Sequence, residues 1–147
     1  MIKLEEITKE NFNKVISLKV ADDSKLSSNL FFIAQLKIYP EWISSAIYYN
    51  DIVVGLMIYE IDHTYKQYII RILMIDEKYQ RNGYGTKAME AIIKIFKQRK
   101  EYKNIILSVF NTDTGTIDFY KKLGFEFNGE VYDEFDEGIM ELKIFWT

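Results

Sequence analysis

Residues 72–86 have the sequence ILMIDEKYQRNGYGT, and they constrain the architecture more tightly than any other segment of the chain. The run from Tyr68 to Ile75 is almost wholly apolar, which predicts a strand covered on both faces. A long helix is predicted from about Gly83 to Arg99. Its apolar residues recur at helical spacing: Ala88, Met89, Ile92, Ile93 and Phe96. The segment therefore predicts a buried strand, a loop and a helix, in that order.

The loop brings two glycines to the predicted helix start. Helix starts carry unpaired N–H groups and the positive end of the macrodipole, so phosphates bind there. Gly83 and Gly85 lack a Cβ and permit positive φ, which lets several N–H groups converge on one anion. Arg81 adds a fixed positive charge beside them. The pattern indicates an anion site, and a plain loop-to-helix turn is the alternative.

The other elements follow from apolar periodicity. Thr8 is a plausible N-cap for the first helix, and Gly124 is a natural residue to close the last one. The order β-α-α-β-β-β-α-β-α-β-β predicts a mixed α/β fold with one βαβ crossover near its centre. Further strands are expected at 2–7, 46–49, 52–61, 104–110, 125–132 and 139–145, and further helices at 9–20, 28–38 and 114–123.

The composition excludes several classes of function and of site. The chain has 147 residues, with 48% hydrophobic and 28% charged, and we expect one domain over 1–147. The absence of cysteine excludes disulfides, thiolate zinc sites and a cysteine nucleophile. A net charge of −3 argues against nucleic acid and suits a cationic substrate. No signal peptide and no membrane-spanning run is apparent, so a cytoplasmic protein that binds no membrane is expected.

A dinucleotide-binding fold is the first alternative to weigh. The spacing Gly83-x-Gly85-x-x-Ala88 formally matches its fingerprint. In that fold, however, the first glycine follows the strand directly, whereas residues 76–82 intervene here. The segment also lies mid-chain, after other predicted strands. His63 leaves a Ser-His-Asp triad open, but no other feature supports one.

Two motifs resemble the GCN5-related N-acetyltransferase superfamily. Residues 72–86 look like its acetyl-CoA motif, (Gln/Arg)-x-x-Gly-x-(Gly/Ala), and Phe119-Tyr120-Lys121-Lys122-Leu123-Gly124-Phe125 looks like its LY-x-x-x-GF box. The resemblance implies a central mixed, mostly antiparallel twisted sheet of six to seven strands, flanked by about four helices. It also implies acetyl-CoA as acyl donor, without a metal.

The resemblance implies roles for single residues. Tyr120 would be the general acid that protonates the departing thiolate, and its alternative is a buried helix tyrosine. The family often has an asparagine that contacts the cofactor seven residues earlier, where this chain has Asp113. An asparagine stands two positions before it, at Asn111, so the resemblance implies a cofactor contact for Asp113 or Asn111. Donor contacts are implied for the backbone of Leu73, Met74 and Ile75 and for the loop residues Gln80, Arg81, Asn82, Gly83, Tyr84, Gly85 and Thr86.

The acceptor amine has to lose a proton before it attacks. Many family members place a glutamate on the strand before the loop, where this chain has Arg71 and Ile72. Glu60 and Asp62, on the preceding strand, are the nearest acids in sequence; surface acids at a strand end are the alternative. Asp22 and Asp23 follow the first predicted helix, where this fold usually lines the acceptor groove.

Within the superfamily, the chain most resembles bacterial spermine/spermidine acetyltransferases, in residues 75–80, 107–110 and 120–130. This implies acetyl transfer to a primary amine such as spermidine, by direct attack in a ternary complex. The alternatives are another small amine, a protein amine, or a non-catalytic sensor of CoA. Exposed sheet edges or the pair Phe145-Trp146 are candidate surfaces for a homodimer.

Overall fold

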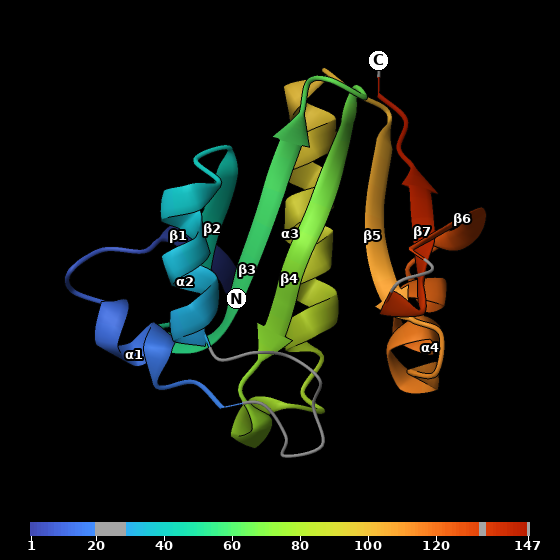
Figure 1. The fold of residues 1–147 in the computed structure, drawn as a ribbon. Coiled ribbons are helices and arrows are strands. Elements are labelled where there is room, and N and C mark those ends of the chain that lie inside the picture. The colour runs from blue at the N-terminus through green and yellow to red at the C-terminus, as the bar shows by residue number, and fades with distance from the viewer. Residues whose placement is uncertain (20–28, 133–134, 147) are drawn as a thin grey trace.

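The computed structural model describes residues 1–19, 29–132 and 135–146. Within these residues, seven strands form one sheet in the order β1-β2-β3-β4-β5-β7-β6 (Figure 1). No helix in the described part of the chain has the length and apolar character needed to cross a membrane. The strands are β1 (Ile2–Glu6), β2 (Trp42–Tyr49), β3 (Ile52–Asp62), β4 (Gln67–Ile75), β5 (Asn104–Phe110), β6 (Glu126–Tyr132) and β7 (Glu137–Lys143).

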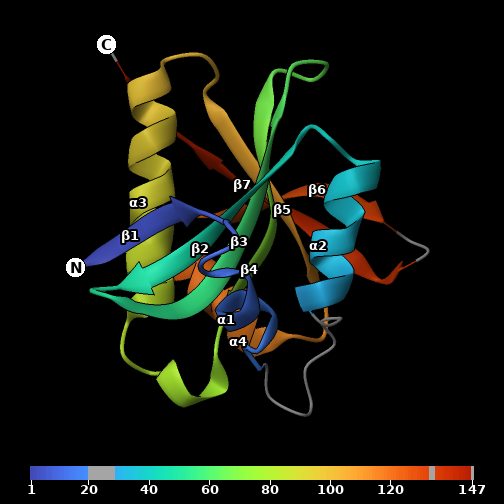
Figure 2. The same ribbon diagram turned by 90° about the vertical axis from the view of Figure 1, so that its left-hand side faces the viewer.

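Helices cover both faces of this sheet (Figure 2). One face packs against α1 and α2 through Val15 and Phe32. The other packs against α3 and α4, where Met89, Ile92 and Phe96 are fully buried. The sheet is thus apolar on both sides, as expected for the middle layer of three. The helices are α1 (Phe12–Ile16), α2 (Asn29–Ile38), α3 (Tyr84–Arg99) and α4 (Thr114–Lys122), with a 3-10 turn η1 (Glu77–Tyr79) after β4.

The strands β4 and β5 are parallel, and they separate soon after they begin. They pair only at Tyr68 with Ile105 and at Ile69 with Ile106. Beyond these pairs β4 stays bonded to β3 and β5 to β7, and Figure 1 shows the two strands diverging toward their carboxyl ends. The sheet is therefore open along one internal edge.

A bulge in β4 changes which way its side chains point. Ile58 on β3 pairs with Ile72, but the next residue, Tyr59, pairs with Ile70, so Arg71 is the extra residue. Before the bulge, Ile70 packs on the α3 side. After it, the residues of even number face α1 and α2, as Ile72 does, and those of odd number face α3 and α4.

The predicted fold class is confirmed, and most predicted elements lie within two residues of their observed bounds. Two elements differ by more. β2 begins at Trp42, four residues before the predicted start, and the first helix begins at Phe12 and ends at Ile16, whereas Lys9 to Val20 was expected. Thr8 is not its N-cap, because the Asn11 side chain accepts from the Thr8 N–H at 2.8 Å and donates to the Glu6 carbonyl at 3.0 Å. These bonds hold residues 8–11 outside the helix.

We expect Phe96→Ala to lower the free energy of unfolding by about 3–5 kcal/mol, because it removes a fully buried ring. That ring stacks on Tyr68, with centroids 3.9 Å apart, and meets Tyr59 edge-on. Urea denaturation measures the loss. Ile95→Ala, in the same helix but 42% exposed, is the matched control and should cost less than about 1 kcal/mol. Equal losses in the two variants would contradict the packing described above.

Candidate functional site

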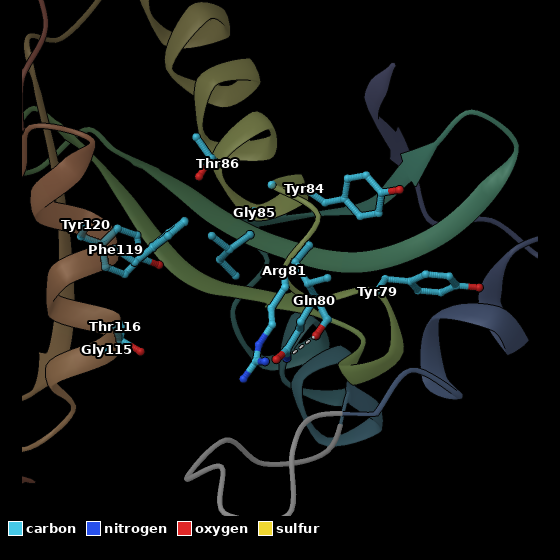
Figure 3. A pocket seen from close by; sticks show the side chains of 13 residues that line it. Tyr79, Gln80, Arg81, Tyr84, Gly85, Thr86, Gly115, Thr116, Phe119 and Tyr120 are labelled. Carbon is cyan, nitrogen blue, oxygen red and sulfur yellow. Dashed lines mark hydrogen bonds between the residues drawn. The ribbon is translucent and has the colours of Figure 1, made fainter.

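A cavity of about 410 Å³ lies where β4 and β5 separate. Its walls come from the end of β4, the loop that follows, the start of α3 and one side of α4. Figure 3 shows Phe119 and Tyr120 on α4 facing the loop and the start of α3 across this space. The lining residues are Leu73, Ile75, Tyr79, Gln80, Arg81, Gly83, Tyr84, Gly85, Thr86, Gly115, Thr116, Phe119 and Tyr120.

The loop between β4 and α3 has an alternating backbone conformation. Arg81 has φ 67° and Gly83 has φ 78°, both in the left-handed region. For arginine this conformation costs about 1–2 kcal/mol. The Asn82 side chain donates to the carbonyls of Tyr79 and Gln80, at 2.9 and 3.2 Å, and so helps to hold the turn. Alternation of this kind turns successive N–H groups toward one side, which is how backbone anion sites are built.

The start of α3 is open to a ligand. Gly83 occupies the N-cap position, and no side chain among the described residues caps the helix. The first-turn N–H groups of Tyr84, Gly85 and Thr86 have no partner within the helix itself. A Cβ placed on Gly83 would meet nothing within 4 Å, so the approach to these groups is clear. Among the described residues that line the cavity, Arg81 is the one that carries a charge, which makes the site suited to an anion.

The hydrogen bonds between β3 and β4 show which backbone groups of β4 face the opening. The Asp76 N–H donates to the Val54 carbonyl at 2.8 Å, which makes these two residues a hydrogen-bonded pair of the ladder. Bonded and non-bonded pairs alternate in antiparallel strands. Met74 therefore directs its backbone to β3, whereas Leu73 and Ile75 direct their N–H and C=O groups toward the opening.

The end of α4 is closed by Gly124 and Phe125, and this closure also holds Tyr120. Gly124 has φ 102°, and its N–H donates to the Lys121 carbonyl at 3.0 Å. The Phe125 N–H donates to the Tyr120 carbonyl at 3.1 Å, and the two rings lie 5.6 Å apart. This arrangement is a Schellman motif with its usual apolar contact. It explains why tyrosine, glycine and phenylalanine occur at this spacing.

The Tyr120 hydroxyl is available to donate a hydrogen bond into the cavity. The residue is 7% exposed and lines the cavity, and its hydroxyl makes no hydrogen bond to any described residue. Burial raises the pKa of the Tyr120 hydroxyl well above its ordinary value, and the charge of Asp113 raises it further. The phenol thus stays protonated in the physiological range and can donate into the cavity.

The structure brings many of the predicted site residues to the cavity, but not all. Met74 points to α1 and α2, and Asn82 is used in folding the loop. Asn111 donates to the Asp136 carboxylate at 3.0 Å. Asp113 caps α4 by accepting from the N–H and hydroxyl of Thr116. Those that line the cavity are Leu73, Ile75, Gln80, Arg81, Gly83, Tyr84, Gly85, Thr86 and Tyr120.

The acids predicted to serve the acceptor lie elsewhere. Glu60, on β3, forms an ion pair with Arg71, on β4, with Arg71 Nη2 and Glu60 Oε1 2.6 Å apart. This pair does not line the cavity. Asp62 organises the turn between β3 and β4, where it accepts from the N–H groups of Thr64 and Tyr65. That turn is at the opposite end of β4 from the cavity, six residues and about 20 Å from Leu73. Asp22 and Asp23 lie outside the described residues.

Four lining residues were missed from the sequence: Tyr79, Gly115, Thr116 and Phe119. Thr116 and Tyr120 are four positions apart on α4, so they share one face of the helix. Helical spacing from Tyr120 was the signal that would have found Thr116. No comparable signal indicated Tyr79, because its position depends on η1.

Comparisons with known proteins agree with this geometry. Residues 4–125 match the Acetyltransferase (GNAT) family. The probable N-acetyltransferase san of Drosophila melanogaster is 31% identical over 127 residues, which cover 85% of this chain and 68% of that protein. A spermine/spermidine N(1)-acetyltransferase of Bacillus subtilis is 28% identical over 138 residues, or 88% and 91% of the two chains. The crystal structure of spermidine N-acetyltransferase from Vibrio cholerae in complex with CoA and spermine has a TM-score of 0.76 at 13% identity, covering 97% of this chain and 95% of that one.

We expect Gly83→Ala and Gly115→Ala to change stability in opposite directions. Both positions have room for a Cβ, but Gly83 has φ 78°. Alanine there should cost about 1–2 kcal/mol of strain. Gly115 is helical, so alanine should add about 0.5 kcal/mol by reducing the entropy of the unfolded chain. Urea denaturation without ligand measures both. A neutral Gly83→Ala would mean that the loop does not require the left-handed conformation.

Proposed function

Because the chain belongs to the Acetyltransferase (GNAT) family, it is an acetyl-CoA-dependent N-acetyltransferase, and we propose that its acceptor is the primary amine of a polyamine such as spermidine or spermine. The observation that carries the enzymatic part is the opening between β4 and β5. The cavity at this opening is lined by the glycine loop, by the end of β4 and by Tyr120, and these groups support the proposal.

The residues of the cavity fit the donor group by group. We assign the pyrophosphate to the backbone N–H groups of residues 81–86, beside the charge of Arg81. We assign the amide-bearing arm to the backbone N–H and C=O of Leu73 and to the N–H of Ile75, which can pair with it as with an added strand. The Ile75 carbonyl already accepts from the Gln80 side chain at 3.0 Å. When bound, acetyl-CoA supplies an acetyl group activated as a thioester.

We assign Tyr120 the role of general acid. Its hydroxyl lines the cavity and stays protonated, because burial raises its pKa. It would donate a hydrogen bond, and then a proton, to the departing sulfur. The chain has no cysteine, so no cysteine thioester forms on the enzyme. The two substrates would then be held together in a ternary complex.

Two observations support a polyamine acceptor. The Bacillus subtilis relative named for spermine and spermidine matches over most of both chains, and the net charge of −3 favours a cation at long range. In this proposal the Glu60 carboxylate is the general base that accepts the amine proton, through water. It pairs across β3 and β4 with Ile69, the last residue of β4 that is bonded to β5.

A peptide amine is the second candidate. It is favoured by apolar side chains exposed on α2 and at the start of β2, at Leu30, Ile38 and Ile43. An apolar surface offers no charged group to bind the ammonium groups of a polyamine, whereas apolar side chains of a peptide can be buried against it.

We expect Tyr120→Phe to lower kcat about a hundredfold, because the general acid is lost. The dissociation constant of CoA should change by less than about twofold, since the ring stays in place. Release of free thiol measures turnover, and calorimetry measures binding. Because the pKa of Tyr120 is raised, native kcat should show no decline from this group below about pH 10.

The matched control is Tyr68→Phe, another buried tyrosine, whose hydroxyl hydrogen-bonds at the far end of β4. It should keep kcat to within about twofold. Unchanged turnover of Tyr120→Phe at several pH values would remove the acid role.

We expect a panel of amines to separate the acceptor classes. Spermidine and spermine should give kcat/KM at least about tenfold above short peptides with free N-termini, aminoglycosides and amino acids. A preference for peptides would favour the second candidate. No thiol release with any amine, despite CoA binding, would identify a sensor of CoA instead of an enzyme.

A further inference from the structure

Asp76 lies where β4 ends and the loop begins, and only 5% of its surface is exposed. Its Oδ1 accepts from the Lys78 N–H at 3.0 Å and so caps η1. Its Oδ2 accepts from the Lys19 N–H, also at 3.0 Å, although the two residues are 57 positions apart. Capping needs one oxygen, so the second bond points to another role.

The backbone reinforces this connection. The Glu77 N–H donates to the Lys19 carbonyl at 2.8 Å, and the Asp76 N–H donates to the Val54 carbonyl at 2.8 Å. Lys19 is thus held through both its N–H and its C=O, three residues after α1 ends at Ile16. The end of the α1 segment and the start of the loop are bonded directly to each other.

The rest of the loop is bonded mainly to itself. Asn82 donates to Tyr79 and Gln80, and Gln80 donates to the Ile75 carbonyl at 3.0 Å. In the described part of the chain, the hydrogen bonds that join residues 76–82 to segments beyond 75–82 are those of Asp76 and Glu77. These bonds are therefore the anchor of the loop.

The anchor holds η1, which has a cavity on each side. A second cavity, of about 280 Å³, lies on the other side of η1, between α1 and the turn from β2 to β3. Tyr79 lines both this cavity and the larger one. With space on both sides, η1 depends on its few bonds for its position.

We propose that Asp76 is a positioning residue that fixes the acyl-donor loop against Lys19, so that donor binding is coupled to the conformation at the end of α1. This inference rests on the proposed role of the larger cavity as the donor site. Arg81 keeps a strained conformation only while the loop is held. Without the anchor, part of the binding free energy is used to order the loop, and affinity falls. Coupling is reciprocal, so bound donor also stabilises the contact at Lys19.

The test is Asp76→Ser. Serine caps helices about as well as aspartate, so η1 keeps its cap, but a shorter side chain with one oxygen cannot also hold Lys19. The KM for acetyl-CoA and the dissociation constant of CoA should rise about tenfold, with kcat at saturation within about twofold. By hydrogen exchange, CoA should protect the Lys19 amide in the native protein and not in the variant.

Lys19→Ala is the matched control, because the anchor uses only the backbone of Lys19; it should behave as the native protein does. Asp76→Asn has the same size but turns an N–H group toward one of the two donors, so it should act in the same direction as Asp76→Ser if the latter fails to fold. A lower Tm with unchanged KM and unchanged protection of Lys19 would overturn the coupling.

The proposed function can fail separately from this inference. If the native protein does not bind CoA, the donor site is refuted. Exchange of residues 77–82 without ligand then tests the anchor alone. Faster exchange in Asp76→Ser than in the native protein would support the anchor, and equal exchange would refute it.

Discussion

The site depends on one constraint: β4 and β5 share only two residue pairs before they separate. Parallel strands normally stay bonded along their length, because an open edge leaves backbone groups unpaired. Here β4 remains fixed by β3, and β5 by β7, so each strand keeps one bonded side. The sheet can therefore open in its interior without unfolding at its borders. In the proposed function, the unpaired groups at this edge are the ones that bind the donor.

Two glycines with positive φ shape the helices on either side of the opening. Gly83 stands before α3 and leaves its start uncapped, so that N–H groups remain available. Gly124 stands after α4 and closes it, and that closure holds the backbone and ring of Tyr120. The same conformational freedom thus exposes polar groups at one helix end and satisfies them at another.

The fold and the strand, loop and helix on one side of the cavity were predictable because their signals are local. The apolar strand at 68–75, the glycine loop and the helix at 83–99 follow one another in the chain, and the structure confirms this order. The predicted enzyme class is confirmed as well. What was missed depends on distant contacts. The bond between Lys19 and Asp76 spans 57 positions. Asp62 organises a turn, whereas the sequence offered it as an acid serving the acceptor or as a surface acid at a strand end. Periodicity contains no information on such pairings.

The bulge at Arg71 has a consequence for how the chain can change length. One extra residue inverts the alternation of β4, so that Leu73 and Ile75, instead of Ile72 and Met74, face the cavity side. The number of residues between the bulge and the loop therefore decides which side chains of β4 face the cavity. A one-residue deletion between Arg71 and Ile75 would turn both the side chains and the free backbone edge away from the opening. A change of chain length is therefore compatible with this arrangement in the turn before Gln67, and not between the bulge and the loop.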